Sequence, residues 1–145
     1  MIVVYNTGQL YKEVCSAIKK YGVKANLNYI DISRVTSLDI LFNNMDFDGN
    51  ISKWNTSNVT SMSCVFKDSS FNGDIGGWNT SEVKNMTFMF YLSKFNQPIG
   101  DWNVENVRDM CDMFSGSKFN GDISKWNVSN VRDMTYMFES SQFNQ

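Results

Sequence analysis

The chain has 145 residues, of which 42% are hydrophobic and 19% are charged, a composition typical of a globular domain rather than a disordered chain. Its formal net charge of -2 argues against a nucleic-acid binder that works through bulk electrostatics. The absence of histidine excludes histidine-based acid–base catalysis, Ser–His and Cys–His nucleophile pairs, and most zinc and iron sites.

Residues 1–26 predict a strand followed by a helix that together cap the rest of the chain. The apolar run at residues 1–5 favours a strand, is too short to span a membrane and lacks the features of a signal peptide, so we expect a cytoplasmic protein unless a leader was removed. Asn6 or Thr7 can cap the helix, and Gly22 suits the position after its last turn. The apolar face of this helix comprises Leu10, Val14, Ala17, Ile18 and Tyr21.

A 24-residue repeat occupies residues 27–145. One phenylalanine column comprises Phe47, Phe71, Phe95, Phe119 and Phe143, and the four tryptophans of the chain form another, Trp54, Trp78, Trp102 and Trp126. The boundaries define a degenerate unit at 27–46, full units at 47–70, 71–94, 95–118 and 119–142, and the start of a further unit at 143–145, all within one structural domain. A period of this length marks supersecondary units that bury their apolar faces only by stacking.

Each unit predicts one short helix and one short strand. Val59, Met62, Val65 and Phe66 are spaced as on one face of a helix. Residues 71–78 combine apolar positions with glycines, which favours a short strand between turns. The expected fold is an α/β repeat solenoid similar to leucine-rich repeats, with short parallel strands on one face and short helices on the other.

Asparagine and methionine also recur in columns. The asparagines, such as Asn72 and Asn96, form either a polar binding row or an inward ladder that bonds backbone groups. The methionines form either a pliable binding surface or part of the core, and their spacing favours the core. Because the chain stops at Gln145 without a polar cap, we expect a truncation, a partner or a homodimer at that edge.

The columns resemble those of the BspA-like leucine-rich-repeat family of bacterial surface proteins, also known as DUF285. The segment 119–134, followed by Met137 and Phe138, is similar to the family consensus, and the resemblance extends over about residues 27–145. It implies a leucine-rich-repeat-like solenoid without enzymatic activity. Many members are surface or lipid-anchored proteins of bacteria and mycoplasmas thought to bind host or matrix proteins. We expect this chain to differ from them, because no leader, lipobox cysteine or cell-wall anchor is recognisable within residues 1–145.

Two exposed rows are candidates for binding a partner. The first is a basic stripe, Lys84, Arg108 and Arg132, flanked by Asp109 and Asp133. The second contains Lys53, Asp101 and Lys125, with glycine and serine beside it. Either row is alternatively a solvated surface, with compensating charges in the first and tight turns in the second.

Three functions compete at this point. The first is a non-enzymatic, intracellular protein-interaction module, encoded on a mobile element and directed at a host or defence protein. The second is a surface adhesin that binds host or matrix proteins. The third is a carboxylate enzyme, which the wide spacing of Asp74 and Asp122 disfavours. We expect a protein partner and no nucleic acid, membrane, metal or cofactor.

Overall fold

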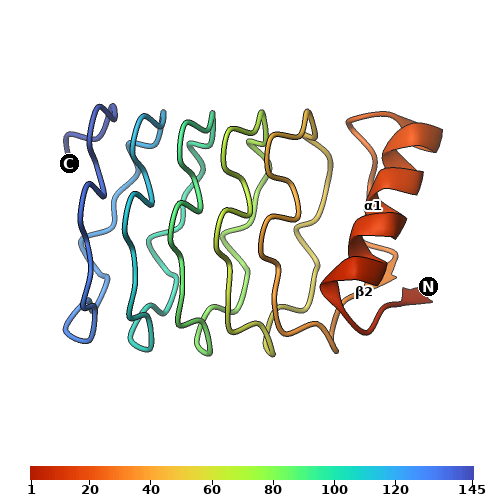
Figure 1. The fold of residues 1–145 in the computed structure, drawn as a ribbon, viewed down its shortest axis with the longest axis horizontal. Coiled ribbons are helices and arrows are strands. Elements are labelled where there is room, and N and C mark those ends of the chain that lie inside the picture. Colours follow the sequence, from red (N-terminus) through yellow and green to blue (C-terminus); the bar gives the residue numbers. More distant parts are fainter.

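The computed structural model describes residues 1–145 as a stack of coils with a helix at one end (Figure 1). It contains one helix, α1 (Thr7–Tyr21), and two strands, β1 (Ile2–Val3) and β2 (Ile30–Asp31), which pair in parallel with Ile2 opposite Ile30. The chain then winds into successive coils that lie side by side, so that α1 and the C-terminus stand at opposite ends of the stack (Figure 1). The one helix is neither long enough nor apolar enough to cross a membrane.

The helix predicted for the N-terminal segment is confirmed at α1. The Oδ1 atom of Asn6 accepts a hydrogen bond from the backbone N–H of Gln9 at 2.9 Å, which satisfies one of the free donors of the first turn. Gly22 ends the helix with a φ of 83°, where its N–H donates to the carbonyl oxygen of Ile18 at 2.8 Å. Leu10, Val14 and Ala17 are buried, so the apolar face of α1 covers the first coil.

Backbone hydrogen bonds join neighbouring coils along one strip of the stack. We call residues 60–68, and their equivalents at 36–44, 84–92, 108–116 and 132–140, the ladder segments. The backbone N–H groups of Met62, Cys64 and Phe66 donate to the next coil at 2.9 Å each. Parallel bridges connect the same position in successive coils, at Ser37, Ser61, Asn85, Asp109 and Asp133.

The helices predicted within the repeats are wrong, since these residues form the ladder segments. Each ladder segment is a run of β-turns, in which the N–H of Met89 donates to Met86 O and that of Tyr91 to Phe88 O, both at 3.2 Å. The φ angles of Phe88 (55°) and Leu92 (53°) lie in the left-handed region, which a right-handed helix excludes. Overlapping turns also direct an apolar side chain inward every three or four residues, so their pattern imitates that of a helix.

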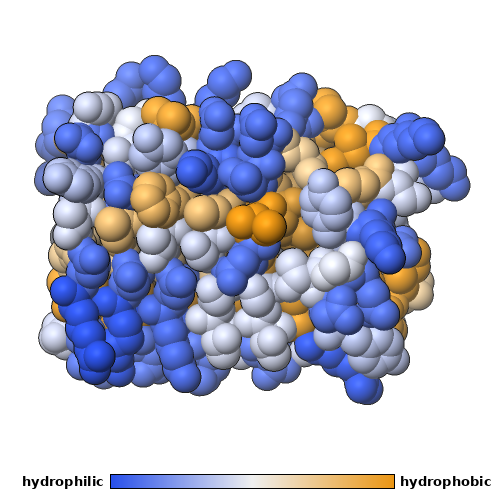
Figure 2. All heavy atoms as spheres, viewed as in Figure 1, coloured by the Kyte–Doolittle hydropathy of each residue, from blue (hydrophilic) through white to orange (hydrophobic).

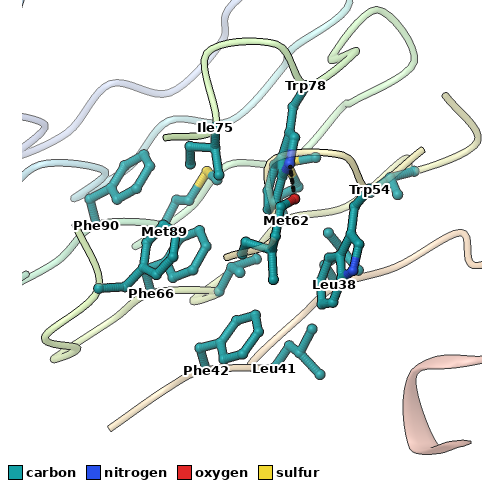
Figure 3. Close-up of a cluster of buried hydrophobic side chains, with 14 of the residues drawn as sticks. Leu38, Leu41, Phe42, Trp54, Met62, Phe66, Ile75, Trp78, Met89 and Phe90 are labelled. Carbon is teal, nitrogen blue, oxygen red and sulfur yellow. Dashed lines mark hydrogen bonds between the residues drawn. The ribbon is translucent and has the colours of Figure 1, made fainter. Parts of the chain in front are cut away.

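The strand predicted at residues 71–78 is also absent, and this side of the coil is joined by side chains instead. The indole Nε1 of Trp78 donates to the carbonyl oxygen of Ile51 in the preceding coil at 3.2 Å (Figure 3). The Oδ1 atom of Asn72 accepts from the backbone N–H of Asn96 at 2.8 Å. The asparagines therefore bond backbone groups, as one of the two hypotheses for their columns predicted. Asn72 and Asn96 are exposed, however, whereas that hypothesis placed them facing inward.

The interior is a single cluster of 37 buried residues that runs through all the coils. Phenylalanine rings stack from coil to coil. One such stack contains Phe42, Phe66 and Phe90, whose neighbouring ring centroids are 5.5 and 5.7 Å apart (Figure 3). Five repeat methionines are fully buried, which confirms that the methionine columns belong mainly to the core; they are Met62, Met86, Met89, Met110 and Met113.

Candidate interaction surface

The structure brings the residues of the predicted basic stripe together on adjacent coils. The backbone N–H of Arg108 donates to Lys84 O, and that of Arg132 donates to Arg108 O, both at 2.8 Å. Lys84 and Arg132 are exposed, and Arg108 is half-buried. The stripe therefore lies at the start of the ladder segments, with three cationic side chains in successive coils.

The flanking aspartates do not form ion pairs with this stripe. The chain has two salt bridges, Lys24–Asp48 and Asp101–Lys125, and neither includes Lys84, Arg108 or Arg132. The Oδ1 atom of Asp109 accepts from the backbone N–H of Cys111 at 3.0 Å, and that of Asp133 accepts from Thr135 at 2.8 Å. Hydrogen bonds from the side chain and backbone of Thr135 hold the pKa of the Asp133 carboxyl below its usual value.

The second predicted row lies outside the ladder segments. Its members Asp101 and Lys125 form an exposed ion pair at 2.9 Å, whereas Lys53 has no carboxylate partner. A groove of about 760 Å³ runs beside this row and is lined entirely by polar residues, glycine and proline. Its carboxylates include Asp74 and Asp122, each of which accepts a backbone N–H two residues later in its own coil.

Two further columns, which the sequence analysis did not propose as binding surfaces, contain surface residues with an unusual backbone conformation. Both consist of left-handed positions within the ladder segments. The first comprises Ile40, Cys64, Phe88, Asp112 and Tyr136, and the second comprises Asn44, Asp68, Leu92, Gly116 and Ser140. Glycine, asparagine and aspartate tolerate the left-handed conformation best, whereas large or β-branched side chains rarely adopt it. We call these two columns the left-handed columns.

Large apolar side chains at the left-handed columns face the solvent. The exposed fraction is 62% for Ile40, 50% for Leu92 and 62% for Tyr136. One face of the stack is mostly hydrophilic but is crossed by a broken band of hydrophobic residues (Figure 2). Ile40, Leu92 and Tyr136 therefore adopt an unfavourable backbone conformation without gaining much burial.

A lysine lies between two aromatic rings beside these columns. The Nζ atom of Lys67 is 5.1 Å from the ring centroid of Phe88 and 5.2 Å from that of Tyr91. The two rings meet edge to face with centroids 5.4 Å apart. Aromatic and basic side chains in contact at a surface are typical of the residues that dominate binding energy in protein interfaces.

The ladder segment at 108–116 contains a cysteine whose pKa is shifted. Burial, followed by the hydrogen bond to Asp112 and neighbouring aspartate charges, raises the pKa of the Cys111 thiol to about 11, so this thiol is protonated at neutral pH. No group of three or more cysteine, aspartate or glutamate side chains is arranged to hold a metal ion.

Alignment of the repeats against one another could have revealed the left-handed columns. Most core positions keep one residue type from unit to unit, whereas position 64 and its equivalents change from Cys64 to Phe88, Asp112 and Tyr136. Their conformation could not be predicted, because the pattern suggested a helix there.

Comparison with known proteins identifies one family. The family model described as "Mycoplasma protein of unknown function, DUF285" matches residues 11–118 and 91–145. No curated protein and no solved structure matches the chain.

Proposed function

Because the chain belongs to the DUF285 family, whose function is unknown, we propose from its surface that it is a repeat solenoid acting as a non-enzymatic protein-interaction module. The proposed contact surface is the outer face of the ladder segments, from the basic stripe to the left-handed columns. Its partner is a protein, held by the exposed apolar residues of this face.

The exposed apolar residues at left-handed positions carry the proposal. A left-handed conformation costs a residue other than glycine roughly 1–2 kcal/mol, and Ile40 is β-branched, which makes it a pronounced outlier. Asp112 in the column of Ile40, and Asn44 and Gly116 in the column of Leu92, show that both columns accept residues for which this cost is smaller. Exposed residues that oppose the local backbone preference are found where function requires them.

The non-enzymatic part of the proposal is supported by the chemistry of the side chains. The chain lacks histidine, and the one thiol with a resolved pKa shift, that of Cys111, is a weaker acid than an ordinary cysteine. The carboxylates of Asp74 and Asp122 accept backbone hydrogen bonds in tight turns, an arrangement that stabilises the coil.

The test compares capture of a cellular partner by wild-type protein and by the double variant Ile40→Asn/Leu92→Asn. Asparagine accepts the left-handed backbone, so we expect an unchanged or slightly higher stability together with loss of the captured protein. The matched control is Val23→Asn/Val128→Asn, which removes two exposed valines outside the ladder segments. Equal capture by all three proteins would contradict the proposal.

We further propose that the protein acts inside the cell, and this location has a separate test. Protease treatment of intact producing cells should leave the protein uncut while lysed cells lose it. Cleavage in intact cells would instead support the alternative, an adhesin-type protein that contacts host or matrix proteins.

A further inference from the structure

The basic stripe of Lys84, Arg108 and Arg132 concentrates positive charge that is not held in any ion pair. The backbones of these residues are hydrogen-bonded in sequence across three coils, which places them about 5 Å apart along the stack. None of the three side chains lies within ion-pair distance of a carboxylate, since the two salt bridges of the chain are elsewhere. Like charges at this spacing repel one another.

One guanidinium nitrogen of the central residue, Arg108, is buried although the residue as a whole is half-buried. The Nη1 atom of Arg108 is buried and has no hydrogen-bond partner. A buried donor on a charged group that lacks a partner is unfavourable, and an anion that reached it would form a charge-assisted hydrogen bond. The stripe thus combines unneutralised charge with an unsatisfied donor at its centre.

The neighbouring column determines which kind of anion fits. Asp109 and Asp133 directly follow Arg108 and Arg132 in the ladder segments. A parallel backbone bridge joins Asp109 in one coil to Asp133 in the next. A continuous phosphate backbone would run beside these two carboxylates, whereas a polypeptide can present carboxylates to the arginines and hydrogen-bond donors to the aspartates.

We propose that the basic stripe binds an acidic segment of a partner protein, with carboxylates paired to Arg108 and to one or both of its neighbours. The inference rests on the proposed function and specifies the chemistry of the partner. In an extended segment, alternate side chains lie on one face about 7 Å apart, within reach of two long cationic side chains on adjacent coils.

The test measures binding of the full chain to a fluorescent peptide of alternating glutamate and serine at low ionic strength, by fluorescence anisotropy. We expect this peptide to bind and the matched glutamine–serine peptide not to bind. Arg108→Gln should weaken binding by about five- to tenfold, with partial rescue by Arg108→Lys. Lys118→Gln, which removes an exposed cation outside the ladder segments, should have no effect.

Three outcomes would overturn the inference. They are equal binding of both peptides, no effect of Arg108→Gln in a variant whose circular dichroism and melting are unchanged, and tighter binding of an oligothymidylate than of the acidic peptide. The proposed function is judged separately by partner capture. If Ile40→Asn/Leu92→Asn abolishes capture while the stripe shows no acidic preference, only the partner chemistry is wrong.

Discussion

At the scale of the residue, two adjacent glycines have opposite environments. A Cβ atom added to Gly76 would lie 2.8 Å from the carbonyl oxygen of Pro98, a backbone atom of the next coil. A Cβ added to Gly77 would have no atom within 4 Å, and its φ requires no glycine. Gly76 therefore permits the close approach of two coils, whereas Gly77 has no packing role.

We accordingly predict that Gly76→Ala lowers the free energy of unfolding by about 1–3 kcal/mol, because the neighbouring backbone must move. Gly77→Ala should leave stability unchanged or raise it by about 0.4–1 kcal/mol by restricting the unfolded chain. Urea denaturation of both variants checks this, and equal midpoints would show that the coils tolerate a wider spacing.

At the scale of the element, each coil is joined to its neighbours by different groups on its two sides. The ladder segments use backbone hydrogen bonds. The opposite side has a backbone bridge between Asn26 and Asn50 in the first coils, and from residue 71 onward it uses side chains, including the indole of Trp78 and the amide of Asn72. Each tryptophan of the repeat, and each of Asn72, Asn96 and Asn120, therefore supplies one hydrogen bond between neighbouring coils. The sequence pattern showed that the tryptophan and asparagine columns recur but not which atoms they join.

Trp78→Phe removes the hydrogen bond to Ile51 O and part of a buried ring, and we expect a loss of about 1–3 kcal/mol in unfolding free energy. Replacing the indole of Trp78 by a benzothiophene keeps the ring and removes the N–H, which isolates the hydrogen bond. The free energy of unfolding of that analogue should be about 0.5–1.5 kcal/mol lower than that of the wild-type protein. Full stability of the analogue would mean that the indole contributes by packing alone.

At the scale of the whole molecule, stacked aromatic rings connect each coil to its neighbours, and we expect the stack to unfold as one cooperative unit. Phe90 stacks on Phe66 and Phe114 in the coils on either side and on Phe95, with ring centroids 5.7, 5.5 and 4.2 Å apart. All the buried apolar residues form one cluster, so a defect in a central coil affects its neighbours on both sides.

Phe90→Ala should therefore lower the free energy of unfolding by about 3–5 kcal/mol, and we expect unfolding to remain a single transition. The matched variant Phe88→Ala, two residues away and half-buried on the outer face, should cost clearly less. Calorimetry of both variants measures these differences. Two separate transitions in Phe90→Ala would show instead that the coils on each side unfold independently.

The sequence by itself determined the 24-residue period, the membership of the buried columns and helix α1, because each depends on local spacing and on which side chains avoid water. Only the tertiary structure decided that backbone pairing lies at residues 60–68 rather than 71–78. The physical reason is that a helix and a run of β-turns both bury apolar residues at the same sequence spacing, so the spacing does not distinguish them. The backbone N–H groups of Met62, Cys64 and Phe66 donate to carbonyl oxygens in the next coil, which are distant in sequence. It also decided that Ile40 and Leu92 are exposed in left-handed positions and that the basic stripe has no internal ion pair.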